Sequence, residues 1–194
     1  MAFLFSIGST YGQFLVPDTY GKGIRFMAAD SSFAAKINTR IQIRYDGFYT
    51  VTDDTSFTDN KYSDKMWVRR ARIKFGGYVL NPKITYKIEY DMVSDQVLDA
   101  LLQWNFAGNF SLWAGQTKLP GNRERVISSQ KLQFVDRSLL NSEYNIDRDK
   151  GLQLRHHFNL GKMLIREISS ISIGEGKNYS TLNPKSGYDW TQRI

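Results

Sequence analysis

The residues from Phe33 to Tyr49 alternate between two kinds of side chain, and this alternation constrains the fold more than any other feature. Odd positions are mainly apolar or aromatic, whereas the even positions carry Lys36, Asn38, Arg40, Gln42, Arg44 and Asp46. Successive side chains of a strand point to opposite faces, so the pattern predicts one apolar face and one polar, mostly basic face. At roughly 3.3 Å per residue the strand would span roughly 55 Å, about three times a usual globular strand. An apolar face toward lipid and a polar face toward water would explain both features.

Composition narrows the class of protein. The hydrophobic fraction is 41% and no stretch approaches the 18 apolar residues of a spanning helix, which excludes a helical membrane protein. Aromatic residues make up 14% of the chain and there are only 4 Pro, which favours strands. There is no Cys, which excludes disulfides and thiolate metal sites, and we expect neither a metal nor a cofactor.

The period-two pattern recurs along the chain. Further strands are predicted over 23–29, 65–80, 83–92, 98–106, 110–118, 151–158, 163–173 and 188–194, giving about nine in total. In the second of these ranges the pattern places Trp67 on the apolar face with Ala71 and Ile73. Arg69 breaks the alternation, which indicates either a β-bulge or the end of the apolar band.

The connections between these strands also alternate. Tight turns are predicted at 81–82, 107–109 and 160–162, and long loops at 51–64, 119–150 and 174–187. Short turns at one rim and long loops at the other are typical of an antiparallel up-and-down transmembrane β-barrel. The loop at 119–150 is long enough to predict a functional role, and a short helix is expected within 128–143.

The first residues of the chain have a different pattern from the predicted strands. A short apolar run followed by small residues predicts that residues 1–12 are the remnant of a signal peptide, and the alternative is an ordinary flexible terminus. Residues 13–22 are then a periplasmic lead segment, and 23–194 form the N-terminal part of the barrel.

The candidate binding residues are the basic side chains on the polar strand faces. Arginine presents a rigid fork of donors to oxyanions, and rows of Arg and Lys select anions in pores. The predicted pore-lining set is Lys36, Arg40, Arg44, Arg70, Arg72, Lys74, Lys83 and Lys87, and the predicted set in the long loop is Lys118, Arg123, Arg125 and Arg137. The alternative is that the charges on the strands are ordinary charges of a water-facing surface and that the charges in the loop form internal salt bridges. No nucleophile and base are arranged for catalysis, so no enzyme is predicted.

Several stretches, taken in order, resemble the phosphate-selective porin O and P family of Gram-negative outer membranes. They are Arg40 and Arg44 in the long strand, Arg69-Arg70-Ala71-Arg72 before Gly76-Gly77, 115–120, Asp136-Arg137-Ser138, 148–151 and Gly187-Tyr188-Asp189-Trp190. The resemblance implies a 16-stranded barrel in contact with outer-membrane lipid, assembly as a homotrimer, and passage of small anions such as phosphate. It also implies that residues 119–150 are a third loop folded into the pore as a constriction loop. About nine strands cannot close such a barrel, so the resemblance identifies the chain as an N-terminal half.

Two other classes of protein compete with this interpretation. An exported soluble β-barrel or sandwich, acting as a binding or adhesion module, would bury Ile41, Ile43, Tyr86 and Ile88 inside. A basic sheet that binds single-stranded nucleic acid is also compatible with the net charge of +7. The signal-like terminus and the strand lengths count against nucleic acid as a partner.

Overall fold

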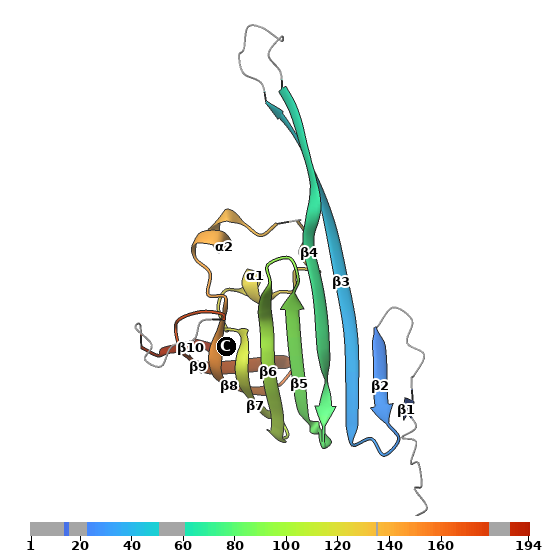
Figure 1. Ribbon diagram of the computed structural model, residues 1–194. Helices are drawn as coiled ribbons and strands as arrows, with labels where there is room; N and C mark the ends of the chain where they lie inside the picture. The colour runs from blue at the N-terminus through green and yellow to red at the C-terminus, as the bar shows by residue number, and fades with distance from the viewer. Residues whose placement is uncertain (1–13, 16–22, 51–60, 135, 179–186) are drawn as a thin grey trace, which may run out of the picture.

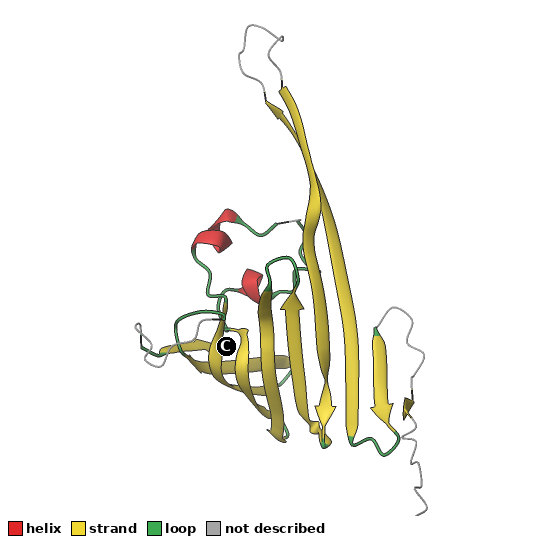
Figure 2. Ribbon diagram, in the orientation of Figure 1, coloured by secondary structure: helices red, strands yellow, loops and turns green. Residues whose placement is uncertain are grey.

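A computed structural model describes residues 14–15, 23–50, 61–134, 136–178 and 187–194, and shows one antiparallel sheet with very little helix (Figures 1 and 2). The strands are β1 (Phe14–Leu15), β2 (Ile24–Ala28), β3 (Phe33–Thr50), β4 (Lys61–Val79), β5 (Asn81–Asp91), β6 (Gln96–Ala107), β7 (Phe110–Lys118), β8 (Arg148–Leu160), β9 (Met163–Ser172) and β10 (Asp189–Arg193). The helices are α1 (Arg123–Val126) and α2 (Leu139–Glu143), both in the connection between β7 and β8. The predicted signal-peptide remnant lies outside the described residues.

The strands follow one another in the sheet in chain order, from β1 to β10. This confirms the predicted all-β, up-and-down architecture, and the strand beyond the expected nine is the two-residue β1. In the described part of the chain no pairing joins β1 to β10, so the sheet is open. No helix in the described ranges is long and apolar enough to cross a membrane.

The two faces of the sheet differ as the alternation predicts. Ile41 and Ile43 are 71% and 59% exposed on the outer face, whereas Arg40, Gln42 and Arg44 are half-buried on the other. A soluble module would have buried Ile41, Ile43, Tyr86 and Ile88, but the three isoleucines are exposed and Tyr86 is only half-buried. The structure therefore does not support that alternative.

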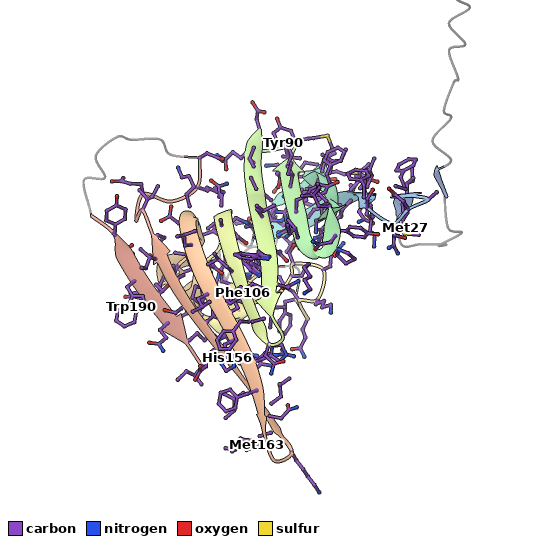
Figure 3. The ribbon with its side chains drawn as sticks, turned by 90° about the horizontal axis from the view of Figure 1, so that it is seen from below. Met27, Tyr90, Phe106, His156, Met163 and Trp190 are labelled. Carbon is purple, nitrogen blue, oxygen red and sulfur yellow. The ribbon has the colours of Figure 1, made fainter. Side chains whose placement is uncertain are left out.

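Aromatic side chains gather on the outer face near the tight turns. Phe106 and Phe110 flank the turn between β6 and β7, and the Phe110 ring stacks on His156 with 4.0 Å between ring centroids. Trp104 and Phe158 extend the row at either end. Figure 3 shows this surface from below with Phe106 and His156 labelled. Such a row at one rim is typical of a wall that meets a membrane interface.

A β-bulge interrupts β4 at Arg69. Gln42 of β3 pairs with Arg70 and the next residue, Ile43, pairs with Val68, so Arg69 is the extra residue. This confirms the bulge as the cause of the broken alternation. It also corrects the prediction for Trp67, because one extra residue exchanges the two faces of everything before it. Val68 now points outward, and Trp67 lies beside Arg44 on the polar face.

Two of the three long connections are shorter than predicted, whereas the one between β9 and β10 runs from 173 to 188 and is slightly longer. β4 already begins at Lys61, so residues 61–64 are strand rather than loop, and residues 51–60 lie outside the described part. β8 begins at Arg148, which leaves 119–147 as the connection from β7; we call this segment the third loop. The short helix expected within 128–143 is confirmed by α2, which occupies the end of that range, and α1 is a further helical turn before it.

Candidate functional site

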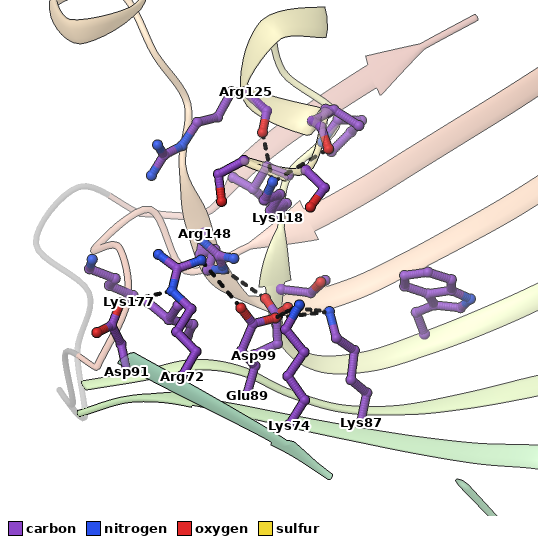
Figure 4. A pocket seen from close by; sticks show the side chains of 18 of the residues that line it. Arg72, Lys74, Lys87, Glu89, Asp91, Asp99, Lys118, Arg125, Arg148 and Lys177 are labelled. Atoms are coloured by element: carbon purple, nitrogen blue, oxygen red, sulfur yellow. Dashed lines mark hydrogen bonds and ion pairs between the residues drawn. The ribbon is translucent and has the colours of Figure 1, made fainter. Parts of the chain in front are cut away.

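The polar face of the sheet and the third loop enclose a cavity of about 460 Å³ (Figure 4). Among the described residues, eleven basic side chains line it, against three acidic ones. The basic residues are Arg70, Arg72, Lys74, Lys87, Lys118, Arg125, Arg137, Arg148, Arg155, Lys177 and Arg193, and the acidic residues are Glu89, Asp91 and Asp99. They come from β4 to β8, from β10 and from the connections between strands, so the curvature of the sheet brings them together.

The third loop is held over this face by its own backbone. At the start of α1, Asn122 Oδ1 accepts a hydrogen bond of 2.8 Å from the Arg125 amide. At its end, Lys118 Nζ donates to the Arg125 carbonyl at 2.8 Å, and Arg137 donates to the Ile127 carbonyl at 3.0 Å. Cations at the carboxyl end of a helical turn satisfy its free carbonyls. Lys118 and Arg137 therefore position the loop as well as line the cavity.

An ion pair fastens the end of the third loop. Arg125 Nε contacts Asp147 Oδ1 at 2.8 Å. Burial raises the pKa of Asp147, but the hydrogen bond and the charge of Arg125 outweigh it, so the pKa lies below its ordinary range. Asp147 is therefore ionised at neutral pH and the pair persists.

The three acidic side chains of the cavity are all engaged in ion pairs. Arg72 contacts Asp91 at 2.8 Å and Glu89 at 3.3 Å. Glu89 also lies 3.4 Å from Lys74. On the next strand Asp99 binds Arg148 at 2.7 Å and also contacts Lys87. The acids therefore neutralise part of the basic set, and their positions are fixed.

Five cations of the cavity have only neutral hydrogen-bond partners among the described residues: Arg70, Lys118, Arg137, Arg155 and Arg193. Arg70 donates to Gln42 at 2.8 Å. Arg155 donates to Gln153 at 2.7 Å and lies 3.3 Å from the centre of the Trp113 ring. Burial, followed by the charge of Arg125, lowers the pKa of Arg137 from its ordinary value. No carboxylate in the described part of the chain forms an ion pair with these groups, so they contribute a positive potential to the cavity.

The arrangement supplies many fixed hydrogen-bond donors and an excess of positive charge. Guanidinium forks of this kind match the oxygens of phosphate and carboxylate groups. In the described ranges no group of three or more His, Cys, Asp or Glu side chains gathers where a metal ion could bind.

The structure divides the predicted site residues into four groups. The cavity brings together Arg70, Arg72, Lys74, Lys87, Lys118, Arg125 and Arg137. Arg40 and Arg44 contact the third loop instead, through Ser129 and Asp136. Lys36 lines a second hollow of about 340 Å³ beside Arg25. Lys83 and Arg123 are exposed and line neither space.

Sequence reasoning missed Trp113, Arg148, Arg155, Lys177 and Arg193 as lining residues. Alternation in β8 carried a signal for one of them, because Arg155 shares a face with Gln153 opposite the outward Leu152 and Leu154. Lys177 and Arg193 reach the cavity only because β9 and β10 curve back toward the loop, which no local pattern indicates.

Comparison with known protein families gives a match over most of the chain. The family model for the phosphate-selective porin O and P matches residues 36–188, which is most of the chain. None of the curated proteins compared with the chain matches it.

Proposed function

The chain belongs to the phosphate-selective porin O and P family, and on this premise we propose that it lines an outer-membrane channel through which small anions, phosphate among them, diffuse. The observation that carries the proposal is the cavity under the third loop, with eleven basic side chains against three acidic ones. All three acids are held in ion pairs, so the net field on a passing solute is positive. Rows of Arg and Lys favour anions in this way.

The loop supports the same proposal by its position. Lys118, Arg125 and Arg137 bring its backbone over the polar face and line the cavity with their own side chains. A solute that follows the polar face must pass this narrow, positively charged region. We assign the third loop as the constriction.

The proposal extends to the assembly of the channel. An open sheet edge in lipid leaves backbone groups unpaired at several kcal/mol each, so a wall in a membrane must close. Further strands must therefore join the edges of β1 and β10. We propose that residues 23–194 supply the N-terminal wall of such a barrel in a Gram-negative outer membrane, after an export signal that ends at residue 12, and that the closed barrels assemble as homotrimers.

Phosphate binding to the chain refolded in detergent tests the proposal without requiring a closed pore. Isothermal titration calorimetry is expected to show saturable binding at constant ionic strength. Arg70→Gln removes a charged donor of the cavity and should weaken this binding about tenfold. Lys162→Gln removes a charge at the exposed turn between β8 and β9 and should leave it unchanged.

Selectivity is tested on the closed barrel in planar bilayers. The zero-current potential in a salt gradient is expected to show preference for anions over cations. Cation preference, or equal phosphate affinity in Arg70→Gln and the unsubstituted chain, would overturn the proposed function.

A further inference from the structure

Two arginines from neighbouring strands converge on one carboxylate of the third loop. Arg44 of β3 donates to one oxygen of Asp136, and Arg69 of β4 donates to the other. Asp136 is not part of the cavity lining, so this contact is separate from the site described above. A carboxylate bound through both oxygens by two guanidinium groups marks a place built for an oxyanion.

The β-bulge creates this place. Arg69 is the extra residue of β4, and the alternation without a bulge would turn it to the apolar face. The same bulge brings Trp67 to the polar face, with its ring centre 5.4 Å from the Arg44 guanidinium carbon and 4.6 Å from Lys65 Nζ. One irregularity thus gathers two guanidinium groups, an ammonium group and an aromatic ring, and one carboxylate of the sheet, Asp46, binds Arg44 Nε at 2.6 Å beside them.

Asp136 does not accept a hydrogen bond from every N–H group of the two arginines. Both of its oxygens are engaged, yet Arg69 Nε is buried and has no acceptor in the described part of the chain. An unpaired buried donor is costly, and a tetrahedral oxyanion has oxygens beyond the two of a carboxylate. A free oxyanion can therefore satisfy this place more fully than Asp136 does.

We propose that Arg44 and Arg69 form a second oxyanion site, which Asp136 occupies in the absence of anion and which an entering phosphate-like anion takes over, so that this part of the third loop leaves the wall. The inference deepens the proposed function and rests on it for the identity of the anion. The release is local, because Arg125 and Asp147 fasten the far end of the loop independently. Arg40, which donates to Ser129 at 2.9 Å, limits how far the freed segment moves.

A spin label on the loop tests the displacement. The sequence contains no Cys, so Phe134→Cys gives a single labelling site, and Phe134 is 80% exposed two residues before Asp136. In the refolded chain we expect a restricted nitroxide spectrum that phosphate converts to a mobile one in a saturable way. Asp136→Asn should give the mobile spectrum without phosphate, and phosphate should bind about fivefold more tightly by calorimetry because its competitor is weakened.

Substitutions at Arg69 identify the site. Arg69→Gln should abolish the spectral response to phosphate. Arg69→Lys keeps the positive charge but lacks the planar guanidinium group, so it should also reduce the response. It replaces Arg69→Gln as the test variant if Arg69→Gln does not refold. Lys131→Gln removes a charge from an exposed residue of the same loop and should leave the response intact.

Three results would overturn the inference: a label that phosphate leaves restricted, a label that sodium chloride of equal ionic strength mobilises equally, or an unchanged affinity in Asp136→Asn. A restricted label together with calorimetric binding that Arg70→Gln weakens would remove this inference and leave the proposed function standing. A spin label that responds to phosphate, together with normal phosphate binding by Arg70→Gln, would remove the proposed function and leave this inference standing.

Discussion

Arg148 of β8 and Asp99 of β6 form an ion pair of 2.7 Å in which the side chains are only 6% and 3% exposed. The two strands are not neighbours, because β7 lies between them. Lys87 of β5 contacts the same carboxylate. One buried Asp therefore joins three strands at the level where the third loop leaves the sheet and returns to it.

Asp99→Asn should destabilise the chain by about 3 kcal/mol, because it removes the nearer carboxylate from the buried Arg148 and leaves only Asp147, at 3.5 Å, as a counter-charge. Denaturant unfolding of the refolded chain in detergent, followed by circular dichroism, measures this change. Asp95→Asn, at the exposed turn between β5 and β6, removes an equal charge and should change the free energy of unfolding by less than about 0.5 kcal/mol. Equal stability of the two variants would show that the buried pair contributes nothing.

Gly76 and Gly77 should respond in opposite ways to the same substitution. A Cβ at Gly76 would meet only the Tyr86 carbonyl oxygen, at 3.4 Å, so Gly76→Ala should be neutral or stabilise by about 0.5 kcal/mol. A Cβ at Gly77 would lie 1.8 Å from the Ala34 carbonyl oxygen, so Gly77→Ala should cost about 3 kcal/mol. Unfolding midpoints of the two variants provide the comparison, and a stable Gly77→Ala would contradict the close approach of β3 and β4.

The contact of Asp136 with the wall should depend on pH in the acid range. The hydrogen bond from Arg44, followed by the charges of Arg69 and Arg44, holds the pKa of Asp136 below its ordinary range despite partial burial. A lowered pKa in the docked state means that the docking free energy is fully present above the ordinary value of about 3.9 and is lost as the pH falls through the lowered one. The label at position 134 should therefore stay restricted from pH 7 to about pH 5 and become mobile below about pH 4. Mobility that already begins above about pH 5 would contradict the assignment to Asp136.

The sequence predicted the strands well because alternation is a local property. The long β3, its basic polar face and the position of the third loop all follow from the order of the residues, and the bulge at Arg69 appeared as a break in that order. The sequence did not predict that the bulge turns Trp67 to the polar face, because this depends on which residue of β3 lies opposite the extra residue of β4. Residue type alone also placed Lys83 and Arg123 in the site; their distance from the cavity depends on where each strand and helix turn ends.

The partners of the site residues were the least predictable part. Arg148 finds Asp99 across an intervening strand, and Arg44 finds Asp136 across 92 positions of chain. Such pairs form only after the sheet has curved and the loop has docked. The excess of basic residues was visible in the sequence, but which of them keep a carboxylate partner was not.

The unequal lengths of the strands make protection from exchange uneven along β3. Near its start, residues 34–37 pair with both β2 and β4, whereas in the described part of the chain residues 43–50 pair with β4 alone (Figure 1). A two-stranded ribbon without a further neighbour is only marginally stable in water. Amide hydrogens should therefore exchange slowly at the sheet end of β3 and quickly toward Thr50, so that one unbroken strand reports two different opening free energies.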